Sequence, residues 1–152
     1  MIKKARGYSA IGLRHPKTSA NIGSVLRAAG CFDATMVAID GHGYTNSKLD
    51  TTKSWRHRPL LIVDDIIKVI PHDCVVVGVE LLEGSRNLKN YIHPERAFYV
   101  FGPEDGCLDD EITSLCRDII YIDTPGPCMN LAACANVVLY DRLVKQKGEN
   151  NE

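Results

Sequence analysis

The chain has 152 residues, a formal net charge of −1, 45% hydrophobic residues and 24% charged residues, which fits one domain spanning residues 1–152. This charge argues against a uniformly basic nucleic-acid binder, and no apolar run approaches the about 20 residues that a membrane span needs. No signal-peptide pattern opens the chain, so we expect a cytoplasmic protein without a membrane partner. The six cysteines form no C-x-x-C pair and the five histidines lack ligand spacing, so we predict no metal site.

The charges are unevenly distributed along the chain. Residues 1–58 carry 10 Lys and Arg against 3 acidic residues, whereas the remainder carries 8 against 16. This asymmetry predicts one electropositive region that can meet phosphates.

The first predicted elements are a strand at residues 8–13 and a helix at residues 18–30. The strand is a short apolar run. Apolar residues at i, i+3, i+4 and i+7 give the helix one buried stripe, and Thr18, Ser19 or Asn21 is available as its N-cap.

Another face of this helix carries Arg27, flanked one turn either way by Gly23 and Gly30. Gly in a helix interior costs about 1 kcal/mol relative to Ala, so two of them on one face need a reason. We expect them to leave open space beside the guanidinium.

A second strand is predicted at residues 34–39 and a loop at residues 40–47. The stretch 53–58 that follows mixes basic residues with the only tryptophan, Trp55. Arg and Lys contact phosphates and Trp stacks on bases, so the stretch suits an RNA contact. A solvated turn with a core tryptophan fits the same residues, and both interpretations stay open.

Further strands are predicted at residues 74–79, 97–101 and 119–122, with short helices at residues 66–70 and 109–116 between them. A last helix runs to about residue 147. Strands that alternate with helices predict an α/β fold with a mainly parallel sheet and helices on both faces.

Two loops follow the later strands. Gly102-Pro-Glu-Asp-Gly is a tight turn that allows a ligand close to its backbone, with Glu104 at the carboxyl end of a strand, where open parallel sheets bind ligands. Residues 124–130 contain two prolines and precede a helix of small residues, so a rigid loop presents a helix N-terminus. An ordinary strand-to-helix connection explains this second loop equally well.

Three motifs in this order resemble the SpoU (TrmH-like) family of RNA ribose 2′-O-methyltransferases in the SPOUT superfamily, in its minimal single-domain form. The motifs are Asn21-x-Gly23-x-x-x-Arg27, Phe101-Gly102-Pro103-Glu104-x-Gly106-x-Leu108 and Met129-Asn130-Leu131. The resemblance implies a deep C-terminal trefoil knot, S-adenosylmethionine as cofactor, and methyl transfer to RNA, with tRNA favoured over rRNA. It also implies a homodimer, for which the small-residue helix from Ala132 is an interface candidate.

The resemblance assigns roles to individual residues. Those implied in catalysis are Arg27, Asn21, Glu104 and Asn130. Those implied in cofactor binding are Phe101, Gly102, Gly106, Ile122, Cys128, Met129 and Leu131. The basic residues expected to contact RNA are Arg14, Lys17, Lys53, Arg56 and Arg58.

The sequence departs from the family pattern at two positions, where Cys128 and Ala132 stand in place of serines. A catalytically silent RNA-binding protein of the same fold, or an RNA base methyltransferase, is therefore an alternative. Arg27 either accepts the proton of the ribose hydroxyl or stays charged and stabilises the developing alkoxide. The first role requires a neutral side chain, whereas arginine is protonated in nearly all protein settings. It acts either in its own subunit or across the dimer.

Overall fold

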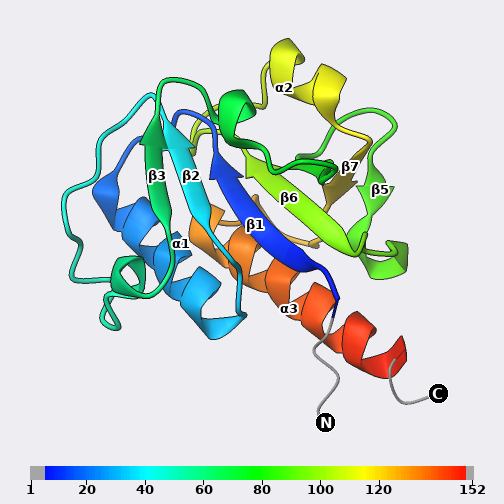
Figure 1. The fold of residues 1–152 in the computed structure, drawn as a ribbon. Coiled ribbons are helices and arrows are strands. Elements are labelled where there is room, and N and C mark those ends of the chain that lie inside the picture. Colours follow the sequence, from blue (N-terminus) through cyan, green and yellow to red (C-terminus); the bar gives the residue numbers. More distant parts are fainter. Residues whose placement is uncertain (1–5, 150–152) are drawn as a thin grey trace, which may run out of the picture.

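The computed structural model describes residues 6–149, so Lys3 and Lys4 of the positive N-terminal region lie outside the described residues. One seven-stranded sheet organises this part of the chain (Figure 1). The strands are β1 (Tyr8–Leu13), β2 (Val37–Asp40), β3 (Leu60–Val63), β4 (Val75–Val79), β5 (Arg86–Asn87), β6 (Arg96–Phe101) and β7 (Asp118–Tyr121). The helices are α1 (Ser19–Cys31), α2 (Asp110–Leu115) and α3 (Leu131–Glu149), with 3₁₀ turns η1 (Ser54–Arg56), η2 (Ile66–Val69) and η3 (Leu88–Asn90).

The sheet has the order β3-β2-β1-β6-β4-β7-β5, and each pair of neighbouring strands is parallel. Strands β1 and β6 lie in the middle, in a register that pairs Leu13 with Phe101 at their carboxyl ends. Both are nearly continuous apolar runs because both of their faces are covered. The predicted α/β fold with a mainly parallel sheet is confirmed, whereas the trefoil knot stays a prediction.

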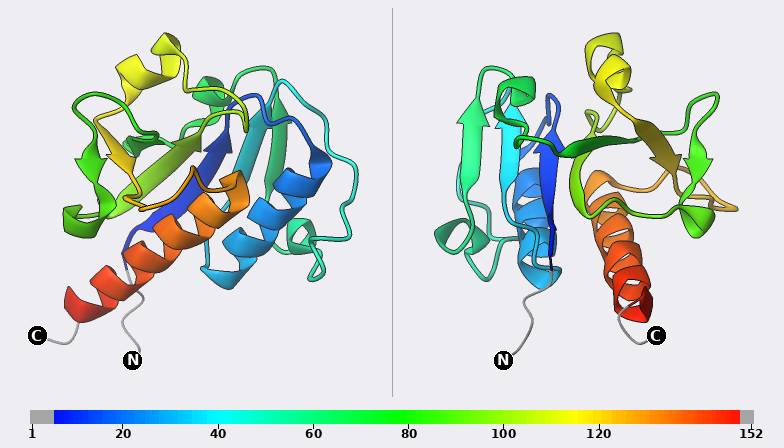
Figure 2. Two further views of the ribbon diagram at one scale, coloured as in Figure 1. Left: turned by 180° about the vertical axis from the view of Figure 1, so that it is seen from behind. Right: turned by 45° about the vertical axis from the view of Figure 1, so that its right-hand side comes forward.

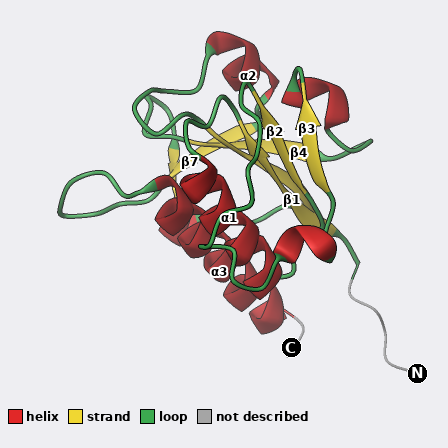
Figure 3. Ribbon diagram, turned by 90° about the vertical axis from the view of Figure 1, so that its left-hand side faces the viewer, coloured by secondary structure: helices red, strands yellow, loops and turns green. Residues whose placement is uncertain are grey.

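Helices cover both faces of the sheet, as predicted. Figure 2 shows α1 and α3 side by side on one face, and Figure 3 shows the same pair from the side. Their apolar residues form the larger core cluster with Ile11, Val77 and Tyr99 of the sheet. On the other face, Ile66 of η2 and Ile112 of α2 pack against strand residues in a smaller cluster.

Helix α1 begins after Thr18, whose hydroxyl accepts a hydrogen bond from the Asn21 backbone N–H at 3.2 Å. Its two glycines do not leave open space. A Cβ atom at Gly23 would lie 2.5 Å from the Cβ of Ser47, and one at Gly30 would lie 2.8 Å from Ser54 Oγ. The expectation of a gap beside Arg27 is therefore wrong, because the glycines let residues 47–54 lie directly against the helix.

Helix α3 is held by a buried polar network. The ring of His93 contacts Asp141 Oδ2 through Nε2 at 2.8 Å and the Tyr99 hydroxyl through Nδ1 at 2.5 Å. Arg142, only 5% exposed, donates to the carbonyl oxygens of Tyr8, Pro94 and Glu95. These contacts join α3 to β6 and to the segment before it.

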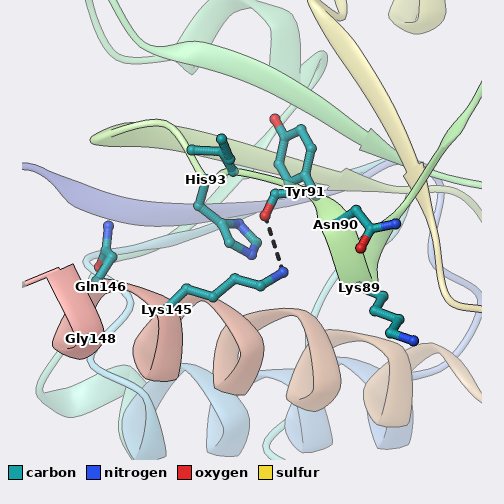
Figure 4. Close-up of a pocket in the computed structure, with 8 residues that line it drawn as sticks. Lys89, Asn90, Tyr91, His93, Lys145, Gln146 and Gly148 are labelled. Atoms are coloured by element: carbon teal, nitrogen blue, oxygen red, sulfur yellow. Dashed lines mark hydrogen bonds between the residues drawn. The ribbon is translucent and has the colours of Figure 1, made fainter.

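A hollow of about 340 Å³ lies beside this network, between residues 89–93 and the last turns of α3. Figure 4 shows Lys145 reaching the Tyr91 carbonyl oxygen across it, at 3.0 Å. Lys145 also donates to the Leu88 carbonyl oxygen at 2.7 Å, so the ammonium of this lysine caps backbone groups.

The small residues of α3 face the core of their own chain. Ala132 is 6% exposed and Ala135 is fully buried. Ala132 and Ala135 are therefore not available for a contact with another chain, whereas the helix from Ala132 as a dimer interface stays a prediction. The exposed apolar residues of the helix are Tyr140 and Val144, and the Tyr140 ring makes an edge contact with Phe32 of α1.

Candidate active site

A pocket of about 480 Å³ lies at the carboxyl ends of β4, β6 and β7. This volume falls within the range of about 300–1,000 Å³ that small-molecule sites occupy. Parallel strands bring their carboxyl ends to one edge, which is where open α/β sheets bind ligands. The lining residues are Val79, Glu80, Leu81, Phe101, Gly102, Pro103, Glu104, Asp105, Gly106, Cys107, Tyr121, Ile122, Asp123, Thr124, Gly126, Cys128, Met129, Leu131 and Cys134.

One wall of the pocket is the turn that follows β6, residues 102–108. The chain doubles back so tightly that a Cβ atom at Gly102 would lie 3.1 Å from the backbone of Cys107 and Leu108. A side chain at Gly102 would push this wall away from β6, because the atoms that it meets belong to the backbone. The tight turn expected after β6 is therefore confirmed, whereas the close approach of a ligand to its backbone stays a prediction.

The opposite wall is the segment from the end of β7 to the first turn of α3. All seven residues predicted to bind a cofactor line the pocket. The structure therefore brings together residues that lie up to 30 positions apart in the chain, between Phe101 and Leu131. Their role in binding stays a prediction.

Three of the four residues predicted to act in catalysis form a hydrogen-bonded chain at the pocket. The side-chain amide of Asn21 donates to Glu104 Oε1 at 2.9 Å, and that of Asn130 donates to Asn21 Oδ1 at 3.2 Å. The other oxygen of Glu104 accepts from the backbone N–H of Lys17 at 2.9 Å. Asn21 comes from α1, Glu104 from the turn after β6, and Asn130 from the start of α3.

Arg27 lies apart from this chain. It stands six residues after Asn21 on α1, which places it about 9 Å further along the helix axis and on a different face. Its side chain is exposed, and no hydrogen bond or ion pair joins it to any residue within 6–149. The guanidinium is therefore free for a ligand or for another chain.

Arg14 does not belong to the surface predicted to contact RNA. Its residue is only 6% exposed, and its guanidinium contacts the carboxylates of Asp40, Asp65, Asp109 and Glu111 at 2.8–3.0 Å. Four of its five N–H donors meet carboxylates, and these four negative charges would repel a phosphate from the buried guanidinium. The prediction of an RNA contact for Arg14 is therefore wrong.

The other basic residues of that prediction differ in how free they are. Lys53 and Arg56 are exposed. The ammonium of Lys17 is paired with Asp105 of the pocket turn, and this contact lowers the pKa of Asp105. Arg58 is half-buried and donates to the Ala34 carbonyl oxygen at 2.7 Å.

Trp55 is half-buried and packs against the larger core cluster. The guanidinium of Arg56 lies over its ring, 5.1 Å from the centroid. The packing of Trp55 fits the interpretation of a core tryptophan, whereas an RNA contact by the basic residues of the stretch 53–58 stays a prediction.

The polar or reactive groups of the pocket that the sequence motifs missed include Glu80 and Cys134. Glu80 follows directly after β4, and its carboxylate accepts from the Leu108 backbone N–H at 3.3 Å. Its position at the carboxyl end of a predicted strand was a signal that could have found it. Cys134, one turn into α3, lines the pocket with a thiol whose pKa is raised by burial.

Two negative findings apply to residues 6–149. No helix there is both long and apolar enough to cross a membrane. No group of three or more His, Cys, Asp or Glu side chains in this part of the chain has the arrangement of a metal site.

The fold is that of an α/β protein with a pocket at the carboxyl edge of a parallel sheet, the edge at which open α/β sheets bind ligands. The family model of the SpoU rRNA methylases matches residues 9–140. The chain therefore belongs to the SpoU rRNA methylase family, and the resemblance seen in the sequence is confirmed.

Solved structures share this fold. AviRb, a SpoU methyltransferase from Streptomyces viridochromogenes, has a TM-score of 0.84 at 18% identity over 95% of this chain, which spans 62% of the length of AviRb. A structure that concerns 2-OH methylation of C/U34 on tRNA has a TM-score of 0.78 at 22% identity, covering 93% of this chain and 98% of that one. An AdoMet-bound rRNA methyltransferase from Sinorhizobium meliloti has a TM-score of 0.78 at 19% identity, covering 95% and 59%. No curated protein matches the chain.

Proposed function

We propose that this protein transfers a methyl group from S-adenosylmethionine to a ribose 2′-hydroxyl of RNA, with tRNA favoured over rRNA. The observation that carries the proposal is the chain of hydrogen bonds from Asn130 through Asn21 to Glu104 at the pocket. Family membership supports RNA methylation. The preference for tRNA is supported by the similar structure that concerns 2-OH methylation on tRNA, since the present chain covers 98% of it.

The pocket suits S-adenosylmethionine, which supplies the methyl group when bound. Apolar side chains of Phe101, Ile122 and Leu131 line it together with the carboxylates of Glu80 and Glu104, which would attract the positive charges of the sulfonium and the ammonium. Gly102 supports this assignment, because its missing side chain keeps the turn close to β6. Structures of AviRb and of the Sinorhizobium meliloti enzyme with AdoMet bound support the choice of cofactor.

The polar chain at the pocket would hold the ribose of the substrate. Glu104 fixes Asn21 by accepting its amide hydrogen, and Asn130 fixes it from the other side. Holding two reactants in one geometry is a large source of rate enhancement. A charged guanidinium beside the attacking oxygen would stabilise the negative charge that develops on it.

We assign that guanidinium to Arg27 of a second copy of the chain. Within one chain Arg27 is exposed, unpaired among residues 6–149 and on a different face of α1 from Asn21. The exposed Tyr140 and Val144 of the neighbouring α3 give the same side of the molecule an apolar surface that a homodimer would bury. Residues 47–54 lie on α1, and the exposed Lys53 and Arg56 stand at the end of this segment. There they would meet RNA phosphates.

Mixed dimers test this assignment. The protein with Arg27→Ala and the protein with Gly102→Val, which displaces one wall of the pocket, should each lose transfer to RNA, measured as 2′-O-methylnucleosides by mass spectrometry. The two variants are then mixed under conditions that let dimers exchange their subunits. If Arg27 acts across the dimer, activity should return, because one site of the mixed dimer combines the intact pocket of one chain with the intact Arg27 of the other. No restoration would refute the assignment across the dimer. Arg27→Ala should keep its affinity for S-adenosylmethionine.

The same measurement separates the alternatives. A methylated base in place of a methylated ribose would identify a base methyltransferase. A wild-type protein that binds RNA but neither binds S-adenosylmethionine in calorimetry nor methylates RNA would be a silent binding protein.

A further inference from the structure

Arg14 is the one buried cation of the described residues that gathers four carboxylates, and the reaction proposed above gives it no part. Its Nη1 lies 2.8 Å from both Asp40 Oδ2 and Asp65 Oδ1. Its Nε lies 2.8 Å from Asp109 Oδ2, and its Nη2 lies 3.0 Å from Glu111 Oε2. Burial alone would lower the pKa of Arg14, but the hydrogen bonds and charges of Asp109 and Asp40 outweigh it and raise the pKa.

Two of the four partners belong to a rigid part of the fold. Asp40 ends β2 and is fully buried, and the oxygen that meets Arg14 also accepts from the Ile66 backbone N–H at 2.9 Å. Asp65 is the N-cap of η2 and accepts from the Ile67 backbone N–H at 2.9 Å. On this side the guanidinium is thus anchored to two carboxylates that are themselves held by backbone N–H groups.

The other two partners lie just beyond the pocket turn. Asp109 is the N-cap of α2 and comes directly after residues 102–108. At the other end of the turn, the backbone N–H of Arg14 donates to the Phe101 carbonyl oxygen at 2.9 Å. Arg14 therefore holds both ends of the turn that forms one wall of the pocket.

The residues after Arg14 continue along the same turn. The Lys17 backbone N–H donates to Glu104 and its ammonium pairs with Asp105. The segment 14–17 is thus joined to the turn 102–108 and its flanking residues at three points. These are Phe101 before the turn, Glu104 and Asp105 within it, and Asp109 after it.

We propose that Arg14 is a positioning residue for methyl transfer, which sets the turn 102–108 as a wall of the cofactor pocket. This rests on the proposed function, because it takes the pocket as the site of S-adenosylmethionine. The residue touches neither reactant. It acts through the turn, so its loss should weaken cofactor binding more than the loss of an equally buried arginine elsewhere.

The structure offers such a matched control in Arg142. It is 5% exposed against 6% for Arg14, and it donates to three backbone carbonyl oxygens, while its side chain does not line the pocket. Arg14→Lys and Arg142→Lys both keep the charge and remove the planar set of N–H donors. We expect both to lower the melting temperature.

Calorimetry on the full chain then distinguishes the two variants. We expect the Kd of S-adenosylmethionine to rise about tenfold or more in Arg14→Lys. Losses of this size are typical when a residue that orients the groups in contact with a ligand is replaced. In Arg142→Lys the Kd should change by less than about twofold, because the site is remote. In turnover assays Arg14→Lys should raise the KM for the cofactor more than it lowers kcat at saturation.

A milder variant keeps the test usable if Arg14→Lys does not fold. Asp109→Asn retains an N-cap for α2 but removes the negative charge that faces Arg14. Its control is Asp33→Asn, which removes an exposed carboxylate paired with Arg58 at 3.0 Å. We expect Asp109→Asn to weaken cofactor binding about threefold or more, and Asp33→Asn to leave it unchanged.

Each outcome has a clear consequence. A Kd within about twofold of wild type in both Arg14→Lys and Asp109→Asn would overturn the positioning role, and so would an equal loss of affinity in Arg142→Lys. A wild-type protein without affinity for S-adenosylmethionine would instead refute the proposed function, and the positioning role with it.

Discussion

Asn130 has two separable duties in this structure, and its variants should separate them. Its Oδ1 accepts from the backbone N–H groups of Ala132 at 2.9 Å and Ala133 at 3.2 Å, so it is the N-cap of α3. Its Nδ2 donates to Asn21 Oδ1 at 3.2 Å in the polar chain at the pocket. Asn130→Ala loses both duties, whereas Asn130→Asp keeps the cap and loses only the donor.

The expected stabilities follow from the cap. Loss of an N-cap costs about 1 kcal/mol, so Asn130→Ala should melt about 2–4 °C below wild type in a chain of this size. Asn130→Asp keeps an acceptor and places a negative charge at a helix N-terminus, a gain of about 0.3–1 kcal/mol. It should therefore melt at or slightly above the wild-type temperature.

The expected activities run the other way. The hydrogen bond from Asn130 to Asn21 contributes about 0.5–1.5 kcal/mol, so its loss in Asn130→Ala should lower methyl transfer about 2- to 10-fold. Asn130→Asp should lose more, because it also brings a second negative charge near Glu104. The more stable variant is thus predicted to be the less active one.

Thermal unfolding followed by circular dichroism and transfer of labelled methyl groups to RNA measure the two quantities. Asn136→Ala is the control, because Asn136 donates within α3 to the Ala132 carbonyl oxygen at 2.8 Å and does not line the pocket. If activity ranks the variants in the same order as stability, the donor to Asn21 has no part in the reaction. If Asn130→Ala melts like wild type, the cap is not significant.

Two further predictions concern stability. Gly23→Ala should lower the free energy of unfolding in urea by about 1–2 kcal/mol, because the new Cβ would meet Ser47 at 2.5 Å and the overpacking outweighs the gain in helix propensity. Gly148→Ala, with nothing within 4 Å of the new atom, should gain up to about 1 kcal/mol, and equal gains at both positions would contradict the packing at Gly23. Burial lowers the pKa of His93, so its contribution to stability is complete above about pH 6.5 and is lost as pH falls from there toward the lower folded-state pKa. The unfolding free energy should therefore drop as the pH falls below about 6.5, less steeply in His93→Gln. An identical slope in that variant would show that His93 does not cause this pH dependence.

The strands that the sequence predicted best are those buried on both faces. Residues 8–13 were predicted as a strand and form β1 with the same bounds, and the run predicted at 97–101 begins one residue earlier as β6. Such runs are recognisable because nearly every position is apolar. The 3₁₀ turn η2 replaces the short helix predicted at 66–70, with Asp65 as its cap.

The strands that were missed lie at the edges of the sheet. β3 (Leu60–Val63) is an apolar run of only four residues, and it is only partly buried, with Ile62 55% exposed. β5 (Arg86–Asn87) has two residues and exists because β7 offers a partner for its backbone. Pairing with a neighbour far along the chain leaves little trace in the local sequence.

Contacts between residues far apart in the sequence also limited the prediction of the site, as Arg14 shows. Arg14 was assigned to an RNA-binding surface because it belongs to the basic region of residues 1–58. Its partners Asp40, Asp65, Asp109 and Glu111 lie 26, 51, 95 and 97 residues away, so local sequence patterns do not reveal them. The turn 102–108 was recognisable because its glycines and proline act locally.

The register of the two central strands explains why the site forms at all. Leu13 and Phe101 are partners at the last level of β1 and β6, so the segments that follow leave the sheet side by side. One of them carries Arg14, Lys17 and Asn21, and the other is the pocket turn with Glu104. Each contact between them, from the Arg14 backbone to the Asn21 amide, depends on that shared starting level. A slip of the pairing by one residue would reverse the faces of the strand and break these contacts together, so the core that fixes the register also fixes the proposed catalytic geometry.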